Sequence, residues 1–411
     1  LKIRRVIPVM KLNNFRIKSV NLKYDVITIS IKFFMAMLLI SIPFKNAFYQ
    51  VSWVGLDVIF LCHIIYKKNF NIISDLLKDI NILLISFIGI VVAQFISNFI
   101  NPEYLNSRSW ETSILFTFRY GILFLALYYF YVIKAFNITE FIIFIVISFA
   151  LLIVTGICNA TDSNNAFLDK VQGGFTGGFI SRNVYGMFMG FAFIFSFIFI
   201  EKPIAKLVFC AILSIFTIFT FSRSSWVAAF FATLFYCIVN FKRNKNLILI
   251  FVTLAFLVLV VLLNIESLSE RFGDLIQGNS SGRYAIWKYS IDMIMQKPIF
   301  GWGIDVFLNL PERAIRIDPS YSMAHNMILE IILYTGFFGA IFYFLGIVYN
   351  IYSSFCYKEF KISTIFIYFL VIFQFDHSPF VNKPILSYIA VFSALLYASR
   401  INNNSNSMRN K

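Results

Sequence analysis

Runs of about 18 or more apolar residues recur along most of this chain, and they restrict its fold more than any other feature. Such a run has the length that a helix needs to cross a bilayer. Lipid offers the backbone no hydrogen-bond partner, so spanning segments of this pattern are helical. Charged residues make up 13% of the 411 residues, against about 25% in soluble domains. The sequence therefore predicts an all-α polytopic membrane protein.

We expect about twelve transmembrane helices from the apolar runs, at residues 26–43, 47–66, 80–100, 113–133, 140–158, 184–200, 204–221, 225–241, 247–264, 324–352, 362–376 and 384–399. The first run is interpreted as a span and not as a cleavable signal peptide. This division predicts a basic segment at 1–25, helices 1–9 within 26–264, a large polar loop at 265–322, helices 10–12 within 323–399 and a tail at 400–411.

Lysine and arginine residues predict how the chain is oriented. The net charge is +15, and the basic residues gather in segment 1–25, in alternate short loops and in the tail. If the spans simply alternate, all of these lie on one side, which the positive-inside rule assigns to the cytoplasm together with both termini. The charge is thus explained by topology and not by a nucleic-acid partner. The 265–322 loop then faces the opposite side.

Three arginines lie at or near the ends of apolar runs, where charge is costly and indicates function. Arg223 stands in FTFSRSSWVAAFF and Arg119 in LFTFRYGILF. The alternative for both is an anchor whose head group reaches the interface. Arg182 and Asn183 follow glycines in GGFTGGFISRNVYG, which allow a loop to approach a ligand closely. The alternative for this pair is a plain turn that enters a span.

The polar loop contains a helix expected to begin at about Arg283, with Ser280 or Ser281 as its cap, and to end before Pro298. Arg283 and the free N–H groups beside it would form an anion clamp; the alternative is a surface charge. We expect one helix face with Tyr284, Trp287, Ile291 and Ile294 and another with Lys288, Asp292 and Gln296. This pattern predicts an amphipathic helix at the membrane boundary. The Gly301-Trp302-Gly303 turn is interpreted as a packing element.

Histidine is the candidate general base, because its ordinary pKa of about 6.5 lets it accept a proton near neutral pH. His325 opens the span after the loop, beside Asn326, and Glu330 follows four residues later on the same helix face. A plain helix-start residue is the alternative. His377, next to Asp376 in the last outer loop, is a reserve candidate for the base. His63, within the second span, is expected to be a core residue.

Metal-binding patterns do not occur in the outer loops. They hold no DxD and no His, Cys, Asp or Glu set with metal spacing. The five cysteines lie in or beside spans without CxxC spacing, so we expect buried thiols, with neither a disulfide framework nor a metal site. We therefore expect no metal and no cofactor. Arginines would have to neutralise any phosphate that binds.

Several motifs in sequence order resemble the O-antigen ligase family. They cover roughly residues 173–352, and they are the FSRSS turn, the G-R-x-x-x-W helix start, P-x-x-G-x-G, and H-N-x-x-L-E heading a glycine-containing span. The motifs are shared by ligases, repeat-unit polymerases and protein O-oligosaccharyltransferases, so they do not separate these members.

The resemblance implies a GT-C-like glycan transferase of the bacterial inner membrane, working on the periplasmic face without a metal and with inversion. It would move an O-antigen-type glycan from undecaprenyl diphosphate to a sugar hydroxyl of lipid A-core. By their place in the motifs, Arg223 and Arg283 would bind the diphosphate, and His325 would activate the acceptor. A repeat-unit polymerase and a polysaccharide transporter or flippase remain as alternatives. A flippase would distribute its charges along a cavity at the midplane, whereas the candidate charges here gather at one face.

Overall fold

The structure is a computed structural model that describes residues 26–44, 47–68, 70–161, 174–177, 179, 181–242, 245–277, 282–319, 321–375 and 383–409. The described residues are helical and contain no strand. The elements are α1 (Val26–Ser41), η1 (Ile42–Phe44), α2 (Ala47–Lys67), α3 (Phe70–Asp79), α4 (Asn81–Ile100), η2 (Pro102–Tyr104), α5 (Ser107–Phe116), η3 (Thr117–Ile122, π-helical), α6 (Leu123–Val132), α7 (Ile138–Thr161), α9 (Arg182–Phe199), α10 (Pro203–Phe219), α11 (Arg223–Asn240), α12 (Asn246–Asn264), α13 (Glu266–Ile276), α14 (Arg283–Gln296), η4 (Phe307–Asn309), α15 (Arg313–Arg316), α16 (Met327–Cys356), α17 (Phe360–Ile372) and α18 (Lys383–Arg409).

Eight helical stretches among the described residues are long and apolar enough to cross a membrane. Three further apolar helices are shorter, at Pro203–Phe219, Phe360–Ile372 and Pro384–Ser399. The chain is therefore a multi-pass membrane protein, and the count of twelve spans stays a prediction. The expectation that all five thiols are buried is wrong for three of them. Cys210 and Cys237 are buried, whereas Cys62, Cys158 and Cys356 are exposed on the helical surface.

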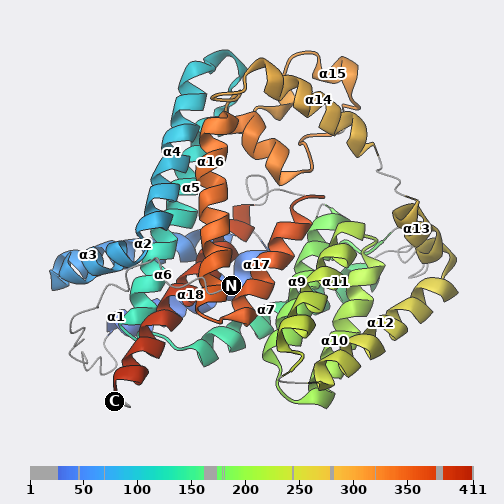
Figure 1. Cartoon of the computed structure of the whole chain (residues 1–411), viewed down its shortest axis with the longest axis horizontal. Coiled ribbons are helices and arrows are strands. Elements are labelled where there is room, and N and C mark those ends of the chain that lie inside the picture. Colours follow the sequence, from blue (N-terminus) through green and yellow to red (C-terminus); the bar gives the residue numbers. More distant parts are fainter. Residues whose placement is uncertain are drawn as a thin grey trace, which may run out of the picture.

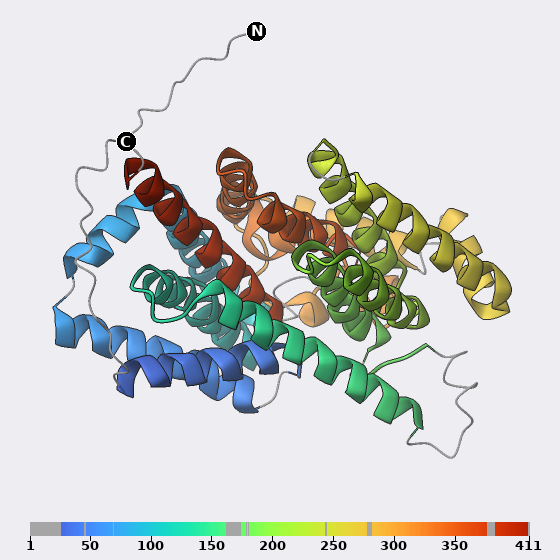
Figure 2. The ribbon, with the colours of Figure 1, turned by 90° about the horizontal axis from the view of Figure 1, so that it is seen from below.

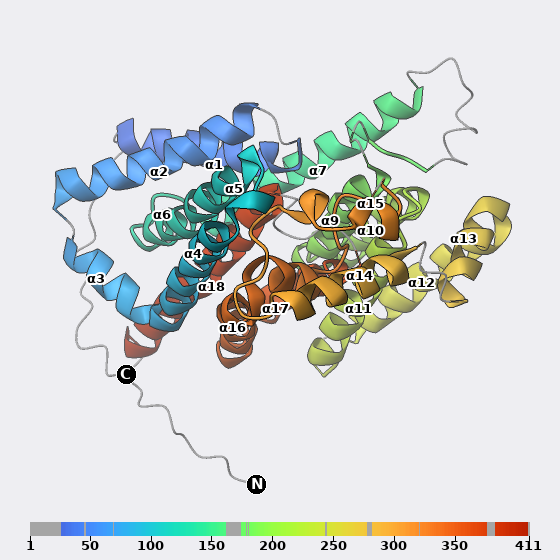
Figure 3. The same ribbon diagram turned by 90° about the horizontal axis from the view of Figure 1, so that it is seen from above.

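The helices form two groups that the C-terminal helices join. Helices α1–α6 lie on one side and α9–α13 on the other, with α16 and α17 between them (Figures 1 and 3). The view from below shows α18 crossing beside the first group and α10–α12 side by side in the second (Figure 2). Helix α16 packs on α4, α18 packs on α6, and α17 packs on both α9 and α11. Helices α14 and α15 cover one end of the molecule, here called the loop end (Figure 1).

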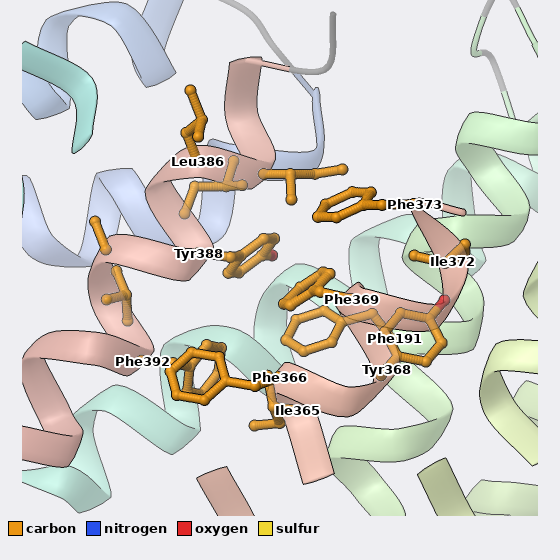
Figure 4. Packing of buried hydrophobic residues seen from close by; sticks show 14 of the residues in the cluster. Phe191, Ile365, Phe366, Tyr368, Phe369, Ile372, Phe373, Leu386, Tyr388 and Phe392 are labelled. Atoms are coloured by element: carbon orange, nitrogen blue, oxygen red, sulfur yellow. The ribbon is translucent and has the colours of Figure 1, made fainter. Parts of the chain in front are cut away.

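Aromatic side chains fill the junction of α9, α17 and α18. The Phe191 ring lies 5.1 Å from the Phe369 ring and 4.8 Å from the Tyr388 ring, between centroids (Figure 4). The Tyr368 hydroxyl donates to the Met187 carbonyl at 2.7 Å. Because lipid removes most of the hydrophobic drive between helices, such close packing and hydrogen bonding hold the bundle together. Each aromatic pair contributes about 0.5–1.5 kcal/mol.

Helix α16 is broken at Gly336, where the backbone has φ 65° and ψ −175°. The Leu333 and Tyr334 carbonyls accept from the N–H groups of Trp302 and Gly303, at 2.9 and 3.1 Å. In turn, Phe337 and Phe338 donate to the carbonyls of Pro298 and Ile299, at 2.8 and 3.1 Å. The 298–303 turn is thereby inserted into the break. This confirms the packing role of the Gly-Trp-Gly turn, and it places a break inside the span expected over 324–352, which the structure retains as Met327–Cys356.

Helix α14 packs on the rest of the protein mainly through residues outside the apolar face that the sequence predicted for the membrane boundary. The helix has the expected bounds, but its N-cap is Gly282, in the left-handed region at φ 79°, and not a serine. Its buried face carries Ile286, Tyr289, Met293 and Ile294, whereas Tyr284 and Ile291 are exposed. Apolar residues thus occur on both faces, and most of the face expected at the membrane boundary is left uncovered by the protein, so its place there stays a prediction. Burial raises the pKa of Tyr289 to about 12, and its neutral hydroxyl donates to the Pro311 carbonyl at 2.7 Å.

Candidate functional site

The turn between α10 and α11 carries Arg223 in a constrained position. Phe221 has φ 56°, in the left-handed region that bulky residues rarely adopt. The Ser222 hydroxyl is bonded to those of Ser224 and Ser225, at 3.1 and 2.8 Å. Arg223 begins α11 and is only 7% exposed. This burial does not fit an arginine that anchors a span by reaching water. Strain of this kind costs about 1–3 kcal/mol and persists where the fold imposes it.

Glycines allow α9 and the segment before it to press against this turn. A Cβ on Gly186 would lie 2.6 Å from the Thr220 hydroxyl and 2.7 Å from Cβ of Ser222. Gly174, at φ 84°, lies between the Phe221 ring and the Cδ atom of Arg182. The glycine-rich motif therefore serves a close approach, but the partner is the α10–α11 turn. This close contact places Arg182, at the start of α9, beside the turn that carries Arg223.

Four arginines meet at this point. Arg223 interacts electrostatically with Arg271, Arg283 and Arg182, and with one carboxylate, that of Asp274. Arg271 also acts on Arg182 and forms an ion pair with Asp274, Nη1 to Oδ2 at 3.4 Å. Arginines from α9, α13 and α14 thus act electrostatically on Arg223 of α11, and Asp274 acts on Arg223 with the opposite sign. Such a concentration of positive charge is suited to a polyanionic ligand.

Tyr321 lies between the start of α14 and His325. The position for a Cβ on Gly282, next to Arg283, lies 2.8 Å from the Tyr321 hydroxyl oxygen. The Tyr321 ring meets the His325 ring edge to face, with centroids 5.9 Å apart. Arg313 of α15 fixes this segment by donating to the Tyr321 carbonyl at 2.8 Å. The three principal candidates from the sequence are therefore brought to one region at the loop end.

His325 has φ 51°, a second left-handed residue at the site. Asn326 caps α16, because its side chain accepts from Leu329 N at 3.0 Å and donates to the Gln374 carbonyl at 3.1 Å. Glu330 is fully buried one turn into the helix and acts electrostatically on Tyr334. In this position Asn326 fixes the start of the helix, and the backbone conformation fixes where the imidazole projects.

The other candidate residues from the sequence have structural contacts of their own or fall outside the described residues. Arg119 lies in η3 and donates to Gln50 at 2.9 Å, with its guanidinium over the rings of Tyr49 and Trp53. Asn183 donates its backbone N–H to the Ser181 hydroxyl, which caps α9. Asp376 and His377 fall outside the described residues. His63 is buried and hydrogen-bonded to the Tyr129 hydroxyl at 2.8 Å, which confirms it as a core residue.

Sequence reasoning did not identify Arg271 and Tyr321. Arg271 stands in SLSERFGDLI between acidic residues and looks like part of an ordinary solvated ion-pair helix. Tyr321 lies in a segment with no helical period, four residues before the histidine. Only the docking of α13 and the contacts of Tyr321 with His325 and Arg313 show that both residues lie near the candidate site. In the part of the chain that the structure describes, no group of three or more His, Cys, Asp or Glu side chains could hold a metal ion.

The fold and the candidate site together define the class of this protein as a helical membrane protein with a cluster of arginines near one end of the bundle. Residues 208–344 match the family model described as O-antigen ligase. This match contains Arg223, Arg271, Arg283 and His325, and it confirms the resemblance to the O-antigen ligase family. The ComP-specific O-oligosaccharyltransferase of Acinetobacter baylyi is 28% identical over 184 residues, covering 41% of this chain and 32% of that protein. The chain thus spans about a third of the length of this curated relative.

Proposed function

We propose that this protein transfers a glycan from a lipid-linked diphosphate, undecaprenyl diphosphate, to an acceptor hydroxyl. The observation that carries the proposal is the meeting of Arg223 and Arg283 with His325 at the loop end, through Tyr321. The match to the O-antigen ligase family supports it. We take lipid A-core as the acceptor, which makes the protein an O-antigen ligase, and the bacterial inner membrane as its location.

The proposed reaction is a displacement at the anomeric carbon. The bond from this carbon to the diphosphate oxygen breaks, and a bond to the acceptor oxygen forms on the opposite face, which inverts the configuration. The electron pair of the broken bond remains on the diphosphate. Arg223 and Arg283 stabilise that charge with paired N–H donors, which act most strongly in a site with little water. His325 accepts the proton of the acceptor hydroxyl, a role typically worth about 10²–10⁴ in rate.

The position of the arginines relative to the membrane-spanning helices suits a lipid-linked substrate. The arginines lie at the ends of α9 and α11, so a diphosphate would bind where its lipid chain can remain in the bilayer. The distribution of basic residues supports placing both termini in the cytoplasm and the loop end in the periplasm. Arg182 would assist the diphosphate site. Asn326 and Glu330 would support His325 from the start of α16.

A polymerase or a protein glycosyltransferase would use the same donor chemistry with a different acceptor. The name of the Acinetobacter baylyi relative, an O-oligosaccharyltransferase, favours including a protein acceptor in any test. A transporter would instead need charges along a path through the bundle. The clustering of the arginines at one end supports chemistry over transport.

The test is transfer by the full chain in proteoliposomes that contain a labelled glycan on undecaprenyl diphosphate. Lipid A-core, a second lipid-linked repeat unit and a hydroxyl-bearing polypeptide are supplied in turn, with proteoliposomes that lack the protein as the control. Transfer to lipid A-core alone supports the ligase. Transfer to the repeat unit or to the polypeptide reassigns the acceptor. Movement of the donor across the bilayer without transfer to any acceptor would overturn the proposal in favour of a transporter.

A further inference from the structure

Two lysines lie at the far end of α9 from the candidate transfer site. Helix α9 begins at Arg182 and is 18 residues long, so Phe199 at its end lies about 27 Å away, close to the hydrocarbon thickness of a bilayer of about 30 Å. Helices α10 and α17 pack on α9, and Lys206 and Lys361 stand within the first four residues of these two helices. The lysines therefore belong to the opposite membrane boundary (Figure 1).

Lys206 is buried without an acceptor for its ammonium group. It is 5% exposed, and among the residues that the structure describes its Nζ atom has neither a hydrogen bond nor an ion pair. The Nζ atom lies over the Phe197 ring, 5.3 Å from the centroid. Lysine is almost never fully buried unless it is paired, and a ring offsets only part of the cost of removing an ammonium group from water. A lysine that only anchors a span extends into water instead.

Lys361 brings a second positive charge to the same place. Its Nζ atom lies over the Phe199 ring at 5.0 Å, and it too has no hydrogen bond or ion pair in the described part of the chain. Lys361 repels Lys206 and has a larger effect on it than Glu201, the carboxylate that acts with the opposite sign. The remaining groups that act on Lys206 are the thiols of Cys210 and Cys237, which are uncharged at neutral pH when their pKa is ordinary.

The starts of α10 and α17 favour an anion at this point as well. Neither N-cap residue, Lys202 for α10 or Glu359 for α17, contributes a side-chain hydrogen bond to the first turn, and neither first turn contains an acidic residue. The positive end of a helix dipole stabilises an anion and disfavours a cation. Lys206 and Lys361 thus stand where their own charge is disfavoured, and a bound anion would offset both the dipoles and the repulsion between the lysines.

We propose that Lys206 and Lys361 bind the phosphate of an anionic phospholipid, on the membrane side that the basic residues assign to the cytoplasm. The phosphate oxygens would accept from both ammonium groups. Basic pockets between transmembrane helices on this side of a membrane bind such head groups. Phe209, three residues after Lys206 and on the same side of α10, is 49% exposed and offers an apolar surface to the lipid chain. The bound lipid would hold α17 to α9 and α10.

Native mass spectrometry of the full chain in a neutral detergent tests the site through the apparent Kd for phosphatidylglycerol and for phosphatidylcholine. Lys206→Met and Lys361→Met remove one charge each and keep a long side chain. The matched control is Lys67→Met, because Lys67 also lies 5.3 Å from a ring centroid, that of Tyr66, but is exposed. We expect each site variant to raise the Kd for phosphatidylglycerol about tenfold relative to the control, with no change for phosphatidylcholine. A Kd within twofold of the control in both site variants overturns the site.

Inorganic phosphate, titrated in a second series, separates the two sources of the phosphate group. Binding of inorganic phosphate that is tighter than binding of the lipid, and that Lys206→Met weakens, assigns the site to a phosphate from water. Binding of the lipid alone assigns it to the bilayer. Glycan transfer is not needed for either measurement, so a failure of the proposed function leaves this test intact.

Thermal unfolding of the same variants shows whether the lysines are only structural. Without lipid, we expect Lys206→Met to unfold at an equal or higher temperature than wild type, because a buried cation is removed. Added phosphatidylglycerol should then raise the unfolding temperature of wild type more than that of the variant. An equal rise in both proteins would overturn the site. If Lys206→Met does not fold, Lys361→Met, at a half-buried position, decides the same comparison.

Discussion

Two buried arginines in this protein have nearly equal exposure and very different surroundings. Arg119 is 6% exposed and Arg223 is 7% exposed. Arg119 donates to Gln50 and lies over two aromatic rings, an arrangement that disperses one positive charge. Arg223 is repelled by three other arginines, Arg271, Arg283 and Arg182, and attracted by Asp274. Burial of a charge inside a membrane protein therefore does not by itself identify a site. The neighbours decide whether the charge is already compensated or is arranged for a ligand.

The comparison is tested most strongly by Arg223→Ala. We expect transfer to fall about 10³-fold or more, because a donor that stabilises the leaving-group charge is lost. The unfolding temperature should stay equal or rise, since a buried cation next to three others is removed. Glycan transfer in proteoliposomes and thermal unfolding in detergent measure the two effects. Substantial unfolding of this variant would mean that Arg223 is a structural residue like Arg119.

His325→Ala is expected to reduce turnover about 10²-fold, toward the lower end of the range for a lost general base, because the diphosphate is already a good leaving group. The donor KM should change little, since the arginines remain. Single-turnover rates with saturating donor measure this. Wild-type turnover in the variant would remove His325 from the mechanism and make His377 the next residue to test.

Gly186→Ala tests whether the strained turn holds Arg223 in place. The added Cβ would lie 2.6 Å from the Thr220 hydroxyl, and such overpacking costs about 1–3 kcal/mol. We expect transfer to fall about tenfold through displacement of the turn. Gly273→Ala is the control, because a Cβ there meets nothing within 4 Å. Equal activity of the two variants would show that the turn tolerates displacement.

Arg119→Gln should have the smallest effect on chemistry. We expect transfer per folded molecule within about twofold of wild type, together with a loss of about 1–3 kcal/mol in stability from the lost hydrogen bond to Gln50 and the lost ring contacts. Thermal unfolding and activity normalised to folded protein are the measurements. A catalytic defect without a stability defect would place Arg119 in the functional site and end the contrast with Arg223.

The helices and the principal candidates for the site could be picked out from the sequence, because both depend on local pattern. Apolar runs give the positions of the helices, and the motifs around Arg223, Arg283 and His325 are short and continuous. The depth of Arg223 and its three charged neighbours could not be predicted in this way. They depend on glycine-mediated contact between α9 and the turn, at Gly186, which is a property of two segments together.

The same limit applies to α14. Its apolar residues fall on both faces, so only the docking against α16 decides that Tyr289 and Met293 are buried in the protein. Arg271 was missed for a related reason, since Glu270 and Asp274 beside it are typical of a solvated helix. The strain at Phe221 and His325 has no pattern in the sequence, because neither residue type signals a positive φ.

The break at Gly336 has a consequence for how the chain is assembled. A membrane-spanning helix normally satisfies its own backbone, and each group left unpaired in lipid costs several kcal/mol. Here the groups around Gly336 are paired with the 298–303 turn, which is made earlier in synthesis and belongs to the polar loop. Helix α16 is therefore incomplete as an inserted unit until the loop folds against it. Folding of the loop and insertion of this helix are therefore coupled, so a defect in the loop should appear first as failed membrane integration.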